Sequence, residues 1–188
     1  MRIAIDIDST LHHYWDRLSD TARHRFGIEL PYDEQFDWGI TRLKPKQLEV
    51  CIAETHSDAA ILAGVPYPGA VQAVRRWHEG GHFIHITSHR QATCHPATEQ
   101  WLKQIELPFD ELYCSFDKVG RCQQIAIDVL IDDSPSNIER ALDAGIVAAT
   151  LRHPWNRDVC EVEDVIAADD WGELEAKLAP VLAGAVRR

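Results

Sequence analysis

Two aspartates separated by a single residue, Asp6 and Asp8, lie near the end of the opening stretch MRIAIDIDST. Residues 2–7 alternate apolar side chains in a way that predicts a buried strand. In an open parallel sheet, ligands bind at the carboxyl ends of the strands, which is where this pair would lie. Two carboxylates in one cleft repel each other and need a cation, a shared proton or a basic neighbour. The pair is therefore the first candidate for a reactive site.

Three later stretches supply partners for such a site. HFIHITSHR places Thr87 and Ser88 at the end of a predicted strand, where hydroxyls could meet the oxygens of a ligand. FDKVGR places Lys118 where a loop passes into a helix, and DVLIDDSPSN places Asp132 and Asp133 at the end of another strand. Because the carboxyl ends of parallel strands share one edge, these side chains are expected in one cleft.

Each of these signals has an ordinary structural reading when it is taken alone. A DxD pair can form a turn, a threonine is common in strands, and a lysine can belong to a solvated helix face. The DDSP stretch is also a good helix start, with Asp and Ser as caps and Pro135 in the first turn. The functional interpretation depends on the four signals occurring together and in order.

Strand and helix patterns alternate along most of the chain. This alternation predicts an α/β fold, with a parallel sheet between two helical layers in a three-layer, Rossmann-like arrangement. The predicted strands are 2–7, 82–87, 112–115, 128–131 and 147–150, with 163–167 as a short edge strand, and the predicted helices are 69–79, 96–105, 118–126, 135–144 and 171–183.

The interval between the first two predicted strands has a different character. Residues 11–66 contain helical patterns at 14–26 and 46–63, with a loop between them and no convincing strand. We therefore expect a core formed by 1–13 and 67–188, and a small helical cap inserted as residues 14–66.

Composition limits the classes of function. The chain has 188 residues, of which 45% are hydrophobic, so it can bury the core of one domain with an insertion. A formal net charge of −11 argues against binding of nucleic acid polymers or anionic membranes. No run is apolar enough to span a membrane and no signal-peptide pattern is present, so a cytoplasmic protein is expected. Five cysteines without a CxxC pair are expected to be reduced thiols, and scattered histidines disfavour a histidine metal site.

The stretches DIDST, ITSHR, DK and LIDDSP together resemble the four motifs of the haloacid dehalogenase superfamily of phosphohydrolases. The helical insertion between the first and second motifs, LIDDSP and the later HPWNR at 153–157 are most similar to bacterial relatives of the 5′-nucleotidases of the 5′(3′)-deoxyribonucleotidase type. The resemblance implies hydrolysis of a small phosphorylated substrate.

The resemblance also implies roles for the candidate residues. Asp6 is expected to be the nucleophile and to form an aspartyl-phosphate. Asp8 would protonate the leaving oxygen and then deprotonate the attacking water. Thr87, with Ser88, would hydrogen-bond the transferring phosphoryl group, and Lys118 would offset its negative charge and hold the nucleophile.

The same resemblance implies Mg²⁺ as the cofactor. Asp6 and Asp132 would provide side-chain ligands, and Asp8 would contribute its backbone carbonyl. Asp133 is expected either to bind the ion or to act on it through water. An all-oxygen ligand set of this kind suits Mg²⁺.

The sequence departs from the family pattern at two positions. Ser9 stands where the first motif usually has glycine, which restricts the backbone but removes no catalytic group. After the second motif, Arg90 is the nearby cation of fixed charge and the candidate for phosphate or sugar recognition. For base stacking we favour Trp38 in the FDWG loop, although aromatic residues are more often core. Trp155 and Asn156 could shape the pocket or simply pack a loop.

These observations favour a Mg²⁺-dependent phosphomonoesterase acting on nucleoside 5′-monophosphates. A phosphatase of another small ester, such as a sugar phosphate, is the first alternative. A non-catalytic binding protein is the second, and the presence of both Asp6 and Asp8 argues against it. A dehalogenase fits less well, because the acidic set suits Mg²⁺ and phosphate. The oligomeric state is open, and a homodimer is one option.

Overall fold

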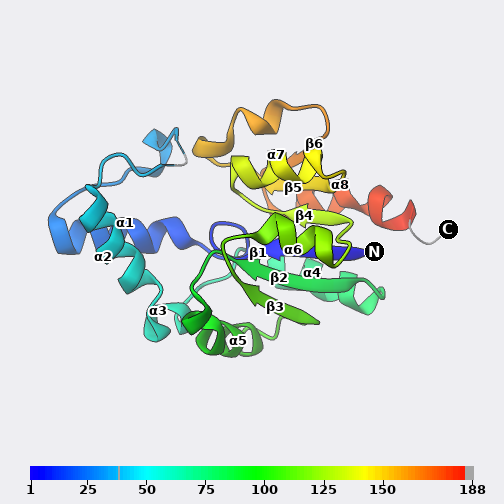
Figure 1. The fold of residues 1–188 in the computed structure, drawn as a ribbon, viewed down its shortest axis with the longest axis horizontal. Helices are drawn as coiled ribbons and strands as arrows, with labels where there is room; N and C mark the ends of the chain where they lie inside the picture. Colours follow the sequence, from blue (N-terminus) through cyan, green and yellow to red (C-terminus); the bar gives the residue numbers. More distant parts are fainter. Residues whose placement is uncertain (38, 185–188) are drawn as a thin grey trace.

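The computed structural model describes residues 1–37 and 39–184, and within them a six-stranded parallel sheet forms the centre of the molecule (Figure 1). The strand order is β3-β2-β1-β4-β5-β6. The strands are β1 (Arg2–Asp6), β2 (Phe83–Ser88), β3 (Glu111–Cys114), β4 (Val129–Ile131), β5 (Val147–Leu151) and β6 (Val165–Ala168).

Helices cover both faces of this sheet. They are α4 (Ala70–Glu79), α5 (His95–Gln104), α6 (Lys118–Gln124), α7 (Pro135–Asp143) and α8 (Trp171–Gly184). On one face, Ile5 and Ile86 pack in a large apolar cluster that also includes Trp77 of α4. On the other face, Leu130 packs with Ile138 of α7 in a smaller cluster. The predicted three-layer α/β fold is confirmed, and each predicted core element begins and ends within two residues of the observed one.

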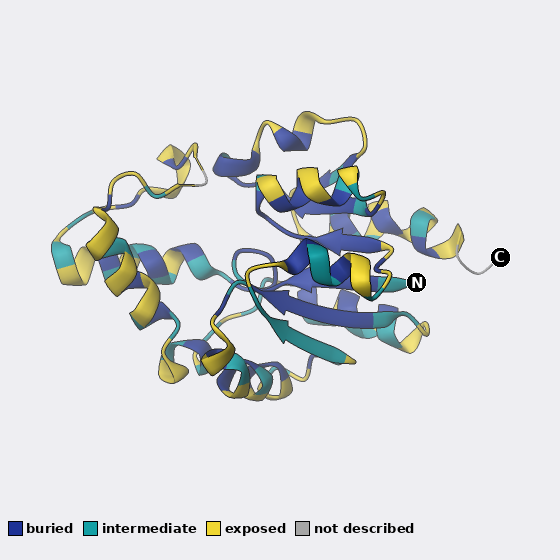
Figure 2. Ribbon diagram, viewed as in Figure 1, coloured by how far each residue is buried: buried dark blue, intermediate teal, exposed yellow. Residues whose placement is uncertain are grey.

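Burial follows this layering (Figure 2). The central strands are almost wholly buried, whereas the outer faces of the helices are exposed. Short 3₁₀ turns at Ala92–Cys94, Pro154–Asn156 and Val159–Glu161 complete the connections of the core. Within the described residues, no helix has the length and apolar character needed to cross a membrane.

The segment between β1 and β2 is helical, as predicted, but one of its helices is divided. It contains α1 (Tyr14–Phe26), a 3₁₀ turn (Tyr32–Glu34), α2 (Pro45–Thr55) and α3 (Asp58–Leu62). The single helix predicted over 46–63 is therefore wrong. The break comes at Ser57, whose backbone is extended and whose hydroxyl accepts a hydrogen bond from the Ala60 N–H at 3.4 Å. Serine is favoured at such N-cap positions because its side chain satisfies a helix-end donor.

The helices α1–α3 lie beyond the carboxyl ends of the central strands (Figure 1). They have a small apolar cluster of their own, in which Trp15, Leu18 and Cys51 are buried. Trp155, from the loop that follows β5, completes this cluster, with its ring centroid 5.4 Å from that of Trp15. The inserted helices are thus packed against the core by an aromatic side chain that the core provides.

Trp101 on α5 gives a test of the larger apolar layer. Its side chain is fully buried, and its indole N–H donates to the Gly64 carbonyl at 3.0 Å. Trp101→Ala should lower the free energy of unfolding by about 3–5 kcal/mol, since it removes a large buried ring and leaves a cavity. Lys103→Ala, on the exposed side of the same helix, should change it by less than about 0.5 kcal/mol. Urea denaturation measures both, and a loss below about 1 kcal/mol for Trp101→Ala would contradict this description of the layer.

Candidate active site

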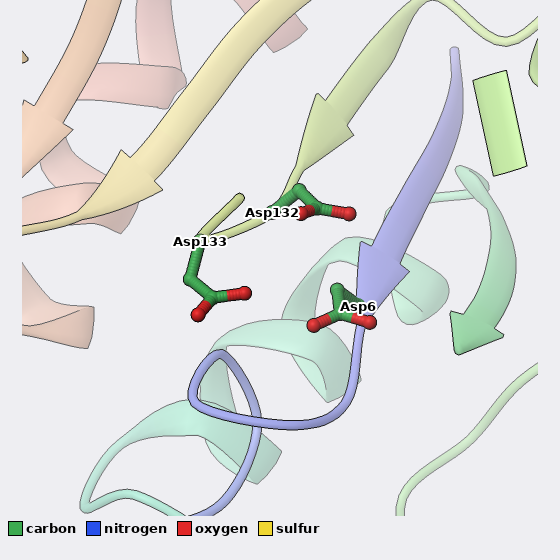
Figure 3. Close-up of side chains that lie close together, drawn as sticks. All are labelled: Asp6, Asp132 and Asp133. Atoms are coloured by element: carbon green, nitrogen blue, oxygen red, sulfur yellow. The ribbon is translucent and has the colours of Figure 1, made fainter. Parts of the chain in front are cut away.

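Three carboxylates meet at the carboxyl ends of β1 and β4. Asp6 ends β1, and Asp132 and Asp133 directly follow β4. The register pairs Ile5 with Ile131, so Asp132 enters the loop beside Asp6. Figure 3 shows the three side chains close together at the strand ends, and each offers one carboxylate oxygen that lies within 4.8 Å of the other two. All three are almost completely buried.

Lys118 balances part of this negative charge. Its ammonium donates to Asp6 Oδ1 and, at 3.1 Å, to Asp132 Oδ2. The side chain is 3% exposed, and burial would by itself lower the lysine pKa, but Asp132 and Asp6 reverse this and raise it. Lys118 is the first residue of α6, which is capped by the Asp117 carboxylate accepting from the Gly120 N–H at 3.2 Å. The helix start therefore fixes the position of the ammonium.

Asp132 has a second donor that the sequence analysis did not select. Asn137 on α7 donates through Nδ2 to both carboxylate oxygens, at 3.2 and 3.1 Å. The Ser134 backbone N–H adds a hydrogen bond to Oδ1 at 2.9 Å. Asn137 stands within the quoted DVLIDDSPSN stretch, five residues after Asp132, and its place in the first turns of a helix starting at Pro135 was the available signal.

The loop 153–157 supports Asp133. Trp155 donates its indole N–H to Asp133 Oδ2 at 3.1 Å, and Asn156 donates to the Asp133 carbonyl at 3.3 Å. Both residues therefore shape the site through Asp133, while Trp155 also packs against the inserted helices. Burial, followed by repulsion from Asp6 and Asp132, raises the pKa of Asp133 well above its usual range. A cation at this point would relieve that repulsion.

The pKa of Asp6 is raised to about 7. Burial is the largest cause, Lys118 offsets part of it, and the charges of Asp132 and Asp8 add to the rise. Thr87 is the register partner of Asp6 on β2 and is fully buried. Among the described residues, its hydroxyl has no hydrogen-bond partner. A polar ligand atom beside Asp6 would satisfy that hydroxyl.

Asp8 lies apart from the three-carboxylate group. Arg90 donates to both of its oxygens, through Nη2 to Oδ1 at 2.7 Å and through Nε to Oδ2 at 3.2 Å. Ser88 donates to Oδ2 at 3.2 Å. Burial would raise the pKa of Asp8, but Arg90 and His12 outweigh it and hold this pKa well below its usual range. Ser88 and Arg90, predicted to bind substrate, thus contact the second aspartate.

Two histidines that the sequence analysis did not select also face Asp8. His12 Nε2 lies 2.9 Å from Asp8 Oδ1, and His56, which follows α2, places Nε2 3.9 Å from Oδ2. Burial lowers the pKa of both. No local pattern marks His56, because its approach to Asp8 depends on how the inserted helices pack. Trp38, the candidate for base stacking, lies outside the described residues.

With this geometry established, the chain can be compared with known proteins. The model of the family described as 5′ nucleotidase, deoxy (Pyrimidine), cytosolic type C protein matches residues 1–183. The chain belongs to this family. A member of this family is a phosphatase of the 5′-nucleotidase type, and its fold is that of haloacid dehalogenase hydrolases.

Individual relatives of this 5′-nucleotidase family member agree with the assignment. A Chlorobaculum tepidum protein, assigned the name 5′(3′)-deoxyribonucleotidase, is 24% identical over 189 residues, covering 93% of this chain and 90% of that protein. A haloacid dehalogenase family hydrolase from Deinococcus radiodurans, solved with phosphate and sodium, superposes with a TM-score of 0.65 at 19% identity, covering 98% and 96% of the two chains. An Entamoeba histolytica hydrolase of the same superfamily gives 0.67 at 13% identity, covering 97% and 99%. The two structures establish the likeness of fold.

Ser9, where this 5′-nucleotidase family member departs from the usual glycine, has a φ of 63°. This is the left-handed region in which glycine is unstrained. His153 secures the turn, since its Nε2–H donates to the Ser9 carbonyl at 2.8 Å. Its Nδ1 therefore accepts from the Tyr32 hydroxyl at 2.8 Å, and its ring stacks on Trp155 at 4.4 Å between centroids. One neutral histidine thus joins the turn at Ser9, the inserted segment and the core.

His153 predicts a dependence of stability on pH. Burial lowers its pKa to about 4, against 6.5 for the free side chain, so the unfolded chain binds the proton more tightly. The contribution of neutral His153 to the free energy of unfolding is therefore present above pH 6.5 and is lost as the pH falls toward 4. Between about pH 7 and about pH 5 this histidine should account for a loss of about 2 kcal/mol.

The measurement is urea denaturation of the wild type and of His153→Gln at both pH values. The variant should be less stable at neutral pH but should lose about 2 kcal/mol less than the wild type on acidification. The exposed His24→Gln is the matched control and should leave the pH dependence unchanged. Equal losses in wild type and His153→Gln would show that His153 is not held neutral by the fold.

Proposed function

We propose that the protein is a Mg²⁺-dependent 5′-nucleotidase that hydrolyses nucleoside 5′-monophosphates through an aspartyl-phosphate on Asp6. The observation that carries the proposal is the buried arrangement of Asp6, Lys118 and Asp132 beside the unpartnered hydroxyl of Thr87, in a chain of the 5′-nucleotidase family. This arrangement places a nucleophile (Asp6), a positive charge (Lys118) and a hydroxyl donor (Thr87) together in one buried site.

The first step transfers the phosphoryl group to the protein. A carboxylate oxygen of Asp6 attacks phosphorus, a new O–P bond forms, and the bond from phosphorus to the nucleoside oxygen breaks. Arg90 and His12 hold the pKa of Asp8 well below its usual range, so Asp8 must first take up a proton from solvent. It then gives that proton to the leaving oxygen, and the nucleoside departs as a neutral alcohol. Lys118 and Thr87 bind the phosphoryl oxygens and Asp6 during the transfer, which keeps the nucleophile in line with the leaving group.

The second step regenerates the carboxylate. Water attacks phosphorus of the aspartyl-phosphate, its proton passes to Asp8, and the O–P bond to Asp6 breaks. The products are inorganic phosphate and free Asp6, and Asp8 again carries the proton that it gave up in the first step. Burial of the site limits the access of bulk water, which favours this order of events.

The acidic group fits Mg²⁺. Asp6, Asp132 and Asp133 present only oxygen ligands within 4.8 Å of one another. Burial and then repulsion from Asp6 and Asp132 raise the pKa of Asp133, and Lys118 offsets only part of this rise. We propose that these three side chains and the Asp8 backbone carbonyl hold the ion. When bound, Mg²⁺ supplies positive charge that neutralises the phosphoryl oxygens.

We propose that residues 14–66 act as a cap that selects the substrate. They contribute Tyr14 and His56 near Asp8, and Tyr32 near Asp133. Preference for nucleotides over sugar phosphates is supported by the matched family and by the assigned name of the Chlorobaculum tepidum relative. The family description also supports a cytoplasmic location.

Phosphate release from a panel of esters tests the proposal. The panel holds deoxyribonucleoside and ribonucleoside 5′-monophosphates and sugar phosphates, each with Mg²⁺ or EDTA. Wild type should release phosphate from nucleotides in the presence of Mg²⁺, and Asp6→Asn should fall to the level of an enzyme-free blank, because an amide cannot form the aspartyl-phosphate. Asp143→Asn, an exposed position at the end of α7, is the control and should retain full activity.

The panel separates the alternatives. Faster release from sugar phosphates than from any nucleotide would replace the nucleotidase by a sugar phosphatase. No release from any ester, with the fold intact by circular dichroism, would favour a non-catalytic binding protein. Activity that survives in Asp6→Asn would overturn the assignment of the nucleophile.

Asp133 gives a separate test of the metal site. Asp133→Asn removes one negative charge from the acidic group and should raise the Mg²⁺ concentration for half-maximal activity by roughly tenfold or more. Activity should return at high Mg²⁺, since Asp6 and Asp132 remain. Titration of phosphate release with Mg²⁺, with Asp143→Asn as the charge-matched control, measures the effect. An unchanged Mg²⁺ requirement would remove Asp133 from the metal site.

A further inference from the structure

Arg90 is a buried cation that the proposed chemistry does not use. It follows β2 by two residues, and its side chain is 2% exposed. Nη2 and Nε donate to the two oxygens of Asp8, and Nη1 donates to the Thr98 hydroxyl of α5 at 3.2 Å. All three guanidinium nitrogens are therefore engaged, and the group points at Asp8.

This arrangement differs from that of a phosphate-binding arginine. Lys118 contacts Asp6 and Asp132, whereas the hydrogen bonds of Arg90 go to Asp8 and Thr98. A phosphate-binding role would require Arg90 to give up its two-point pair with Asp8, whose side chain is half-buried. Such two-point pairs between arginine and carboxylate are strong and fix the plane of the carboxylate.

The other groups that face Asp8 cannot fix it as well. Ser88 forms a single hydrogen bond at 3.2 Å, and His56 stands off at 3.9 Å. His12 contacts Oδ1 at 2.9 Å and lies 3.2 Å from Arg90 Nη2, so it packs against the same pair. Only the guanidinium holds both oxygens, among the described residues, and it is itself anchored to the core helix α5 through Thr98.

We infer that Arg90 is a positioning residue for Asp8: it holds the carboxylate where a proton passes to the leaving oxygen, and it does not bind the phosphate. The inference rests on the proposed function, in which Asp8 is the proton donor. It assigns to Arg90 an effect on both proton transfers of Asp8, of which only the first depends on the leaving group. The loss on substitution should depend on how much the leaving group needs a proton.

Two substrates and two variants test this dependence. p-Nitrophenolate is a stable anion that leaves without a proton, whereas the 5′ oxygen of a nucleoside needs one. The rate of leaving-group release in a single turnover isolates the first step from hydrolysis of the aspartyl-phosphate. In Arg90→Gln that rate should fall by about 100-fold or more for a nucleoside 5′-monophosphate, but by less than about tenfold for p-nitrophenyl phosphate.

Thr98→Val keeps Arg90 but removes the hydroxyl to which its Nη1 donates. This variant replaces Arg90→Gln in the test if Arg90→Gln does not fold. It should shift the ratio of the two rates in the same direction by a smaller factor. Arg75→Gln, an exposed arginine on α4, is the matched control and should leave both rates unchanged. Inhibition by inorganic phosphate is measured for each variant, and it should be unchanged in Arg90→Gln.

The outcomes distinguish the roles. Weaker inhibition by inorganic phosphate, with equal losses for both esters, would make Arg90 a phosphate ligand and overturn the inference. Equal losses with unchanged inhibition would show a purely structural role and also overturn it. A wild type that hydrolyses neither ester would refute the proposed function, whereas an active wild type with equal losses in the variants would refute only the role of Arg90.

Discussion

The contact of the Lys118 ammonium with Asp6 and Asp132 is the interaction on which the site depends. A carboxylate without a partner is costly to bury, and this site buries three. One ammonium balances one charge, so Asn137, Ser134 and Trp155 must stabilise the others with hydrogen bonds. Burial, followed by the negative charges of Asp6 and Asp132, raises the pKa of Asp133, and a cation would relieve the excess of negative charge.

The order of the strands in the sheet brings these charged side chains together. The chain leaves β1 toward β2 and β3 on one side and returns to β4, β5 and β6 on the other, so β1 lies between β2 and β4. Loops then diverge on either side of Asp6, which opens room at the strand ends. Thr87 comes level with Asp6 from one neighbour, and Asp132 follows from the other. Residues more than a hundred positions apart thus meet through strand register alone.

The extent to which the sequence predicts the site follows from the same geometry. Asp6, Thr87 and Asp132 could be placed beforehand because each stands at the end of an apolar strand pattern, and parallel strand ends meet at one edge. Lys118 could be placed because it begins a helix. Strand and helix periods are local properties, and the core elements were therefore predictable.

What the sequence could not supply depends on packing between distant segments. The approach of His56 to Asp8 is set by how α2 packs beyond the strand ends, and Trp155 enters the apolar cluster of the inserted helices from a core loop. Ser57 is a residue type that favours a helix start, but the apolar pattern continues through it and predicts one uninterrupted helix. The partner of Arg90 could not be predicted, because an arginine in a loop beside the site can contact either the phosphate or Asp8.

Asp6 and Asp8 show how one short segment can provide two different carboxylates. Alternation along an extended backbone sends neighbouring side chains in different directions, but residues two apart would ordinarily share a face. Here β1 ends at Asp6 and the chain turns, so Asp6 faces Lys118 and the acidic group, whereas Asp8 faces Arg90 and His12. Burial among carboxylates raises the pKa of Asp6, and the guanidinium lowers that of Asp8. The end of one strand therefore separates the two aspartates into two electrostatic environments.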